Sequence, residues 1–277
     1  MFPSLENPNG IAQLPGMPEL TVGDLPTFML PFSPPHFRLW VAEFVSVLDK
    51  VKWVLGNSVN ELEEETVNSL ALVKPIYPIG PLVSPILLGK EETVEGSVDM
   101  WRAQDYCIEW LNKQEPSSVI YVSFGSIIMS SENQIHSIAL ALKNIKRPFR
   151  WVVKASNARK DEFPSGFLEE IKKEKWVAYP EWTDQPTNSK LLVDFFKIGV
   201  RMRNRGEEGL SVEEVERCIM EVTDGAGARE MKRRAMELKE AAKKALGDAG
   251  SSNRNIDRFI SEIMENHTAI TFNSSSS

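Results

Sequence analysis

The sequence predicts an α/β protein built on a doubly wound, parallel sheet. Two observations favour this fold class. Apolar runs rich in β-branched and aromatic residues alternate with amphipathic segments, as in VIYVSF at 119–124, a helical pattern at 131–145 and FRWVV at 149–153. VIYVSF also lacks the polar alternation of a half-exposed strand, which is typical of strands buried inside parallel sheets.

The first third of the chain is predicted to hold short strands and helices after an irregular start. Proline and glycine are too frequent between residues 2 and 35 for long regular elements. Apolar residues at helical spacing predict a helix over 37–51, and an acidic first turn supports another over 61–70. Strands are expected at 53–57 (WVLGN) and 76–81 (IYPIGP).

The middle of the chain is predicted to continue the alternation. The helix at 131–145 begins after Ser130 and Ser131, with Glu132 and Gln134 close behind, a pattern that favours capping. The other elements expected here are helices at 104–112 and 167–175, a strand at 176–179, a polar elbow at 180–186, a helix carrying Leu191 to Phe196, and a strand at 198–202.

The last part is predicted to be helical. SVEE at 211–214 has the residue pattern of a capping box and precedes apolar residues on one helical face. Two further amphipathic helices are expected at 229–246 and 253–265. The final residues are rich in serine and are expected to be disordered.

The composition limits the possible partners. Of the 277 residues, 42% are hydrophobic and 26% charged, as in an ordinary globular protein. A net charge of -7 argues against nucleic acid or anionic membrane as the main partner. No apolar run reaches eighteen residues and the start lacks a signal-peptide pattern, so we expect a cytoplasmic protein without stable membrane insertion. Cys107 and Cys218 are far apart and predict neither a disulfide framework nor a metal site.

The polar elbow is the strongest candidate site. Ligands of open α/β sheets bind where strand ends meet helix N-termini. The residues at this position are Glu181, Trp182, Thr183, Asp184 and Gln185. Asp184 and Gln185 together can bond the neighbouring hydroxyls of a sugar.

Other interpretations of the elbow stay open. Thr183 or Asp184 can instead be a helix N-cap, with Pro186 in the first turn, and this role is compatible with sugar binding. A glycosidase-like pair of Glu181 and Asp184 is disfavoured, because residues three apart across an elbow are more plausibly independent.

A second candidate lies at the end of the strand at 119–124. Gly125 lets the backbone approach a ligand and the Ser126 hydroxyl can donate to a phosphate. The alternative is a simple strand-to-helix turn, since neither GxGxxG nor GxxxxGK is present.

One junction conflicts with ordinary chain geometry. The predicted helix at 167–175 runs into the predicted strand at 176–179 with no Gly, Asn or Pro between them. Helix-to-strand connections usually take about two to six residues and a left-handed cap residue. We therefore expect residues to be missing between Lys175 and Val177.

Six segments resemble plant UDP-dependent glycosyltransferases of family 1, in the family's order. They are NSVNELEEE, YPIGPLV, CIEWLNKQEPSSVIYVSFGS, FPSGFLEE, AYPEWTDQPTNSKLLVDFFKIGVRMR and SVEEVERCIMEV. The resemblance covers nearly the whole chain. It implies a GT-B fold of two Rossmann-like domains, the N-terminal one truncated and the C-terminal one internally shortened near 175–177.

The resemblance also implies a division of the chain. The expected parts are a remnant of the acceptor-binding domain at 1–81, a linker at 82–103, the UDP-sugar-binding domain at 104–245, a C-terminal helix at 246–268 that packs on the N-terminal domain, and a disordered tail at 269–277.

Only some of the family's site residues have counterparts here. Ser126 matches the serine near the UDP phosphates. Trp182, Thr183, Asp184 and Gln185 match the end of the donor box that binds the sugar, with Asp184 and Gln185 on the glucose hydroxyls. The histidine base, its aspartate partner and the nucleotide-binding start of the box match no position, so no catalytic residue is assigned.

The resemblance leads to two hypotheses. The first is inverting transfer of a hexose, by the family's habit glucose, from a UDP-sugar to a hydroxyl or carboxyl of a small phenolic or carboxylic acid, without a metal. The second is a catalytically inactive fragment or splice form that at most binds or interacts, because loss of a general base costs on the order of 10²–10⁴ in rate.

Overall fold

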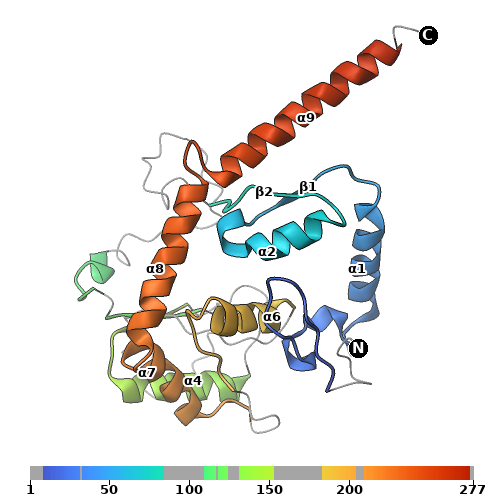
Figure 1. Ribbon diagram of the computed structural model, residues 1–277. Helices are drawn as coiled ribbons and strands as arrows, with labels where there is room; N and C mark the ends of the chain where they lie inside the picture. Colours follow the sequence, from blue (N-terminus) through green and yellow to red (C-terminus); the bar gives the residue numbers. More distant parts are fainter. Residues whose placement is uncertain are drawn as a thin grey trace. The chain divides into compact units, whose positions relative to one another are not determined.

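The computed structural model describes residues 9–31, 33–83, 109–116, 118–123, 131–152, 183–203 and 209–274, with only the backbone for 266–274. The chain divides into two compact units, each described by itself. Unit 1 consists of Met1–Val22, Phe28–Glu95 and Arg233–Ser277, and unit 2 of Gly23–Thr27 and Gly96–Lys232. Figure 1 shows the elements and their labels.

Unit 1 contains a strand–helix–strand arrangement. Strands β1 (Val54–Gly56) and β2 (Ile76–Pro78) pair in parallel. Helix α2 (Asn60–Ala71) connects them and packs against β2 (Figure 1). The two strands and the helix lie where the apolar runs and the acidic first turn predict them. Helix α1 (Pro35–Leu48) precedes this arrangement and has no buried residue.

The C-terminal helix of unit 1 is attached to the same strands. Helix α9 (Ser251–Ser274) packs against β2 and α2. The Ser252 hydroxyl donates to the Gly80 carbonyl at 2.6 Å, and the Asn255 amide donates to the Pro78 carbonyl at 2.7 Å. The Glu262 carboxylate accepts from both Trp53 Nε1 and Tyr77 Oη. A chain segment distant in sequence therefore closes one side of the small sheet.

Unit 2 is built on a second parallel pair. Strand β3 (Ile120–Ser123) pairs with β4 (Phe149–Val152), and α4 (Glu132–Ile145) forms the crossover between them. Helix α7 (Val212–Thr223) packs on α4. The buried side chains that these elements share include Ile120, Ile138, Leu142, Trp151, Val215 and Ile219. The start of α4 confirms the predicted cap, because Ser131 and Gln134 form a reciprocal capping box.

The region after the elbow differs from the prediction. Helix α6 (Gln185–Lys190) continues as the π-helix η6 (Leu191–Phe195). The expected strand at 198–202 is absent from the described structure, where only Arg201 forms a single bridge. A strand needs a hydrogen-bonded neighbour, and the neighbour expected at 176–179 lies outside the described residues, as does the helix expected at 167–175.

The boundaries of the units also differ from the expected domains. Residues Gly23–Thr27 belong to unit 2, and the second boundary falls inside helix α8 (Ala228–Ala245) rather than after it. Helix α9 continues to Ser274, so residues 269–274 are helical and not a disordered tail. Most of the expected linker lies outside the described residues, among which no helix is long and apolar enough to span a membrane.

Candidate sugar-binding elbow

The described part of the elbow begins with an unusual backbone conformation. Thr183 has a φ of 58°, in the left-handed region that β-branched residues rarely occupy. Two hydrogen bonds hold it there: Thr183 N donates to Thr27 Oγ1 at 2.8 Å, and Thr27 N donates to the Thr183 carbonyl at 2.7 Å. Such conformations cluster at functional sites, where the surrounding structure stabilises them.

The Asp184 side chain is exposed and oriented by its neighbours. Its Oδ1 accepts from the Thr183 hydroxyl at 2.8 Å and its Oδ2 accepts from the Asn188 amide at 2.6 Å. Hydrogen bonds to the charged form, first that of Thr183, lower the pKa of Asp184. The carboxylate is therefore ionised at neutral pH and keeps lone pairs that face solvent.

Asp184 occupies the N-cap position of α6 without capping it through its side chain. No bond runs from a helix N–H to its carboxylate. Pro186, in the first turn, has no N–H to donate, and the Asp184 backbone is helical rather than extended, at φ -85° and ψ -9°. Asp184 is therefore the N-cap residue, as one interpretation of the elbow predicts, but its side chain forms no cap bond and its carboxylate remains available to a ligand.

The other predicted residues are only partly placed. Gln185 is the first residue of α6 and half-buried next to Asp184. Ser126, Trp182 and Glu181 lie outside the described residues, so neither the approach of Ser126 to the elbow nor a Glu181–Asp184 pair is tested.

A segment near the N-terminus supports the elbow, and the sequence does not predict it. Thr187 Oγ1 donates to the Asp24 carbonyl at 2.6 Å. The Asp24 carboxylate is buried, with the residue 5% exposed, and pairs with the Arg201 guanidinium at 2.5 Å. Arg201 also donates to the Gly23 carbonyl. Asp24 lies in the irregular, proline-rich start, where no periodicity or motif indicates a partner more than 170 residues away.

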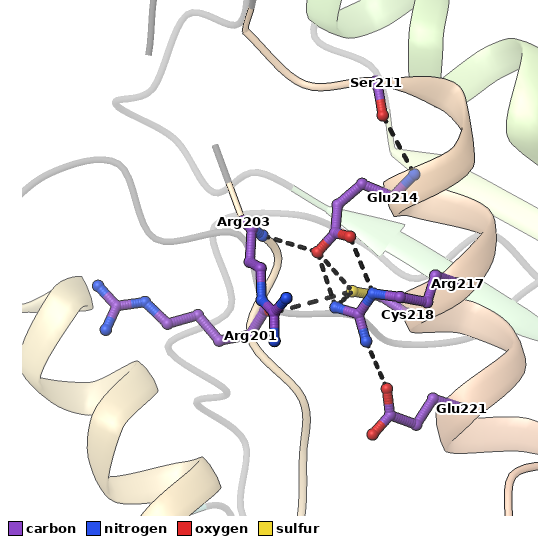
Figure 2. Close-up of polar contacts among 7 residues, drawn as sticks. All are labelled: Arg201, Arg203, Ser211, Glu214, Arg217, Cys218 and Glu221. Atoms are coloured by element: carbon purple, nitrogen blue, oxygen red, sulfur yellow. Dashed lines mark hydrogen bonds and ion pairs between the residues drawn. The ribbon is translucent and has the colours of Figure 1, made fainter. Parts of the chain in front are cut away.

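A second polar cluster lies at the start of α7 (Figure 2). Ser211 Oγ accepts from Glu214 N at 3.3 Å, as the SVEE pattern predicts. The reciprocal half of the predicted capping box is not formed. The Glu214 carboxylate instead accepts from Arg203 N at 2.9 Å and from the Arg217 guanidinium at 2.7 and 2.8 Å. A charged, bidentate partner outcompetes a single backbone N–H for the carboxylate.

This cluster changes the titration of its members. The hydrogen bonds from Arg217 lower the pKa of Glu214 to about 2. Burial raises the pKa of the Cys218 thiol to about 12. Cys218 is therefore a protonated, packed thiol at neutral pH and not a nucleophile.

The lowered pKa of Glu214 predicts a pH dependence of stability. Its folded-state pKa lies below the unfolded value near 4.5, so ionised Glu214 stabilises the fold above that pH. This contribution is lost as the pH falls from 4.5 towards 2. In urea titrations, the stability difference between wild type and Glu214→Gln should be nearly the same at pH 7 and 4.5 and clearly smaller at pH 3. The exposed neighbour Glu213 gives the control, Glu213→Gln, for which a difference of the same size and pH dependence would contradict the prediction.

Comparison with known proteins identifies relatives of this chain. No family sequence model matches the chain. UDP-glycosyltransferase 84B2 of Arabidopsis thaliana is 46% identical over 95% of this chain and 68% of its own length. The chain belongs to the plant UDP-glycosyltransferase family. Gallate 1-beta-glucosyltransferase 84A24 of Punica granatum, a further relative, is 34% identical over 99% of this chain and 61% of its own length.

Solved glycosyltransferase structures agree with this assignment. Os79 from O. sativa, crystallised in complex with UDP, superposes with a TM-score of 0.77 at 26% identity, over 91% of this chain and 67% of its own. The fold is therefore of the GT-B type. The chain spans about two thirds of the length of the curated relatives that it matches.

The alignment also bears on the suspected missing residues. The match to the 84B2 glycosyltransferase extends over 302 residues, more than the 277 of this chain. The relative therefore carries residues inside the matched region that have no counterpart here. This agrees with an internally shortened chain, although the junction between Lys175 and Val177 itself lies outside the described residues.

Proposed function

We propose that the chain is a UDP-glycosyltransferase that uses its elbow to bind the hexose of a UDP-sugar. The reaction would be inverting transfer of the hexose, with glucose as the expected sugar, to a hydroxyl or carboxyl of a small phenolic or carboxylic acid. Close relatives named UDP-glycosyltransferases and a similar structure crystallised with UDP support this donor class. A relative named for gallate supports an aromatic acid as acceptor. We also propose that transfer needs no metal and takes place in the cytoplasm.

The observation that carries the proposal is the state of Asp184. An ionised, exposed carboxylate held by Thr183 and Asn188 is an oriented acceptor for sugar hydroxyls. Gln185 adds an amide, which both donates and accepts, at the adjacent position. The strained Thr183 backbone presents the two side chains at the N-terminal end of α6. In this proposal Trp182 and Thr183 complete the sugar-binding end, and Ser126 lies near the diphosphate.

The assigned residues bind and orient the donor, and none of them is assigned as a base. His36 lies on α1 in unit 1 and is exposed, with a tilted ring contact to Phe37 and an edge contact to Trp40. His136 lies on α4 and is exposed.

One observation favours a second candidate function, donor binding without transfer. The relatives contain internal residues without counterparts in this chain. A shortened donor domain without an assigned base would retain sugar contacts at the elbow and lose most of the rate. Both functions use the elbow to bind the donor, and only the first includes transfer of the sugar.

The test is calorimetric titration of the folded chain with UDP-glucose and with UDP, alongside product formation from a panel of phenols and aromatic acids. Asp184→Asn should weaken UDP-glucose binding about ten-fold, because one charged hydrogen bond to a sugar hydroxyl is worth about 1.4 kcal/mol. The same change should leave UDP affinity unaltered.

The matched control is Asp248→Asn, at an exposed aspartate in the turn after α8. Equal losses of UDP-glucose affinity in the two variants would contradict the proposed role of Asp184 in binding the sugar. A folded chain without UDP-glucose affinity would overturn both functions. Binding without product would select the second candidate, and turnover would exclude it.

A further inference from the structure

Unit 2 contains a charged pocket that the proposed donor site does not use. Its volume is about 550 Å³, within the range of small-ligand sites, which runs to roughly 1,000 Å³. Asp184 and Gln185 are not among its lining residues. Five cationic side chains line it: Lys190, Lys197, Arg201, Arg203 and Arg217.

Three of these cations are neutralised by the three carboxylates that also line the pocket. Lys190 pairs with Asp194, Arg201 with Asp24, and Arg217 with Glu221, each at 2.5 Å. The remaining two are Lys197 and Arg203. Within the described part of the chain, neither side chain has a carboxylate partner, and both are exposed. Among the described lining residues, the cations therefore outnumber the carboxylates by two. Glu214, which does not line the pocket, contacts Arg217 as well and lowers the net charge of the surroundings by one.

The two uncompensated cations are attached to backbone that is held in place. Arg203 N donates to the Glu214 carboxylate, as Figure 2 shows, so this residue is anchored to α7. Lys197 has a φ of 56° and lies two residues after the end of η6. The next residue, Ile198, donates its N–H to the Leu192 carbonyl at 2.9 Å. Their side chains are thus presented to the pocket from positioned residues, which lowers the entropy cost of binding an anion.

The rest of the lining is apolar. Val193, Val200 and Met231 contribute side chains, and Gly199 leaves the wall open, since a Cβ built there would meet no atom within 4 Å. An anion in this pocket would therefore have an apolar surface next to it. Lys197 and Arg203 together can contact one phosphate monoester, and the arginine fork suits phosphate oxygens.

We propose that this pocket binds a small phosphate monoester, with its phosphate on Lys197 and Arg203 and its organic part against Val193, Val200 and Met231. This binding site goes beyond the donor site at the elbow. It does not depend on whether the chain transfers sugar.

The experiment is isothermal titration of the full chain with phenyl phosphate, inorganic phosphate and benzyl alcohol at two salt concentrations. Phenyl phosphate should bind more tightly than either of the others, and more weakly at high salt. Lys197→Gln with Arg203→Gln should weaken it at least 30-fold. The control removes equal charge from exposed α8 positions, Lys239→Gln with Lys244→Gln, and should leave the affinity within two-fold.

A variant that keeps every charge distinguishes binding inside the pocket from nonspecific electrostatic attraction of the anion. Gly199→Leu places a side chain in the pocket and should abolish phenyl phosphate binding, whereas Gly199→Ala should weaken it less. Thermal unfolding of each variant verifies that it is folded. Unchanged binding in Gly199→Leu, or equal affinity for inorganic phosphate and phenyl phosphate, would overturn the proposal.

The donor site gives a further check. Asp184→Asn should retain phenyl phosphate binding, and the Lys197/Arg203 variant should retain whatever UDP-glucose affinity the wild type shows. If the Lys197/Arg203 variant lost UDP-glucose binding instead, the pocket would belong to the donor site, and the proposal of a separate ligand would fail.

Discussion

Replacing Leu142 by alanine is expected to lower the free energy of unfolding of unit 2 by about 3 kcal/mol. Leu142 is 1% exposed and lies on α4, in the core cluster that joins α4, α7 and the β3–β4 pair. The truncation removes buried apolar surface and leaves a cavity that close-packed neighbours fill only partly. Urea denaturation followed by tryptophan fluorescence measures the effect, because Trp151 is buried in the same cluster.

Met220 provides the matched control for this change. It lies on α7 and is 52% exposed, so Met220→Ala removes a large side chain from a helix without opening a cavity. Its cost should stay below about 1 kcal/mol. Similar losses for both variants would show that the α4–α7 packing described here is not the core of unit 2.

Replacing Asp24 by alanine should cost about 2–3 kcal/mol, the second largest effect that the structure predicts. The change removes the carboxylate of a buried ion pair and leaves the Arg201 guanidinium, 33% exposed, without its charge partner. The partial exposure of Arg201 keeps the loss below that of a fully buried pair. Since Thr187 bonds the Asp24 carbonyl, loosening of this segment should also disturb the elbow and weaken UDP-glucose binding.

A double-mutant cycle with Arg201→Gln isolates the pair. The coupling energy should be about 1–3 kcal/mol, as expected for residues in direct contact. The exposed α8 pair of Arg233 and Glu237 is the reference, with side chains 53% and 59% exposed, and its coupling should stay below about 1 kcal/mol. A coupling for Asp24 and Arg201 as small as that of the reference would contradict the anchoring role of Asp24.

Local patterns were sufficient for elements whose hydrogen bonds close within a short stretch of chain. The helical spacing after Ser131 and the apolar runs on either side predict α4, β3 and β4 with boundaries within two residues. The capping box of α4 is complete, with the Gln134 side chain accepting from the N-cap backbone. Where a cation is near, as Arg217 is to Glu214, the same kind of motif forms only in half.

The candidate site was predicted less completely. Asp184 and Gln185 are candidates because of their chemistry and because WTDQ resembles the family's donor box, and their role in sugar binding stays a prediction. The left-handed backbone of Thr183 was not predicted, because it depends on hydrogen bonds to Thr27, 156 residues away. Likewise, no local signal distinguishes a side-chain cap at Asp184 from a carboxylate held by Thr183 and Asn188.

The sequence by itself determined the α/β class, through the periodicity of its apolar residues, and the family, through segments that resemble it. It also supplied the residues that we propose for sugar binding, Asp184 and Gln185. All of these signals depend on near neighbours along the chain. Only the tertiary structure decided that Asp24 and Thr27 support the elbow, that α9 closes the sheet of unit 1, and that Lys197 and Arg203 share a pocket. Contacts between segments more than a hundred residues apart depend on how the chain folds in space, and so does the charge balance of a pocket. Neither produces a periodic pattern in the sequence.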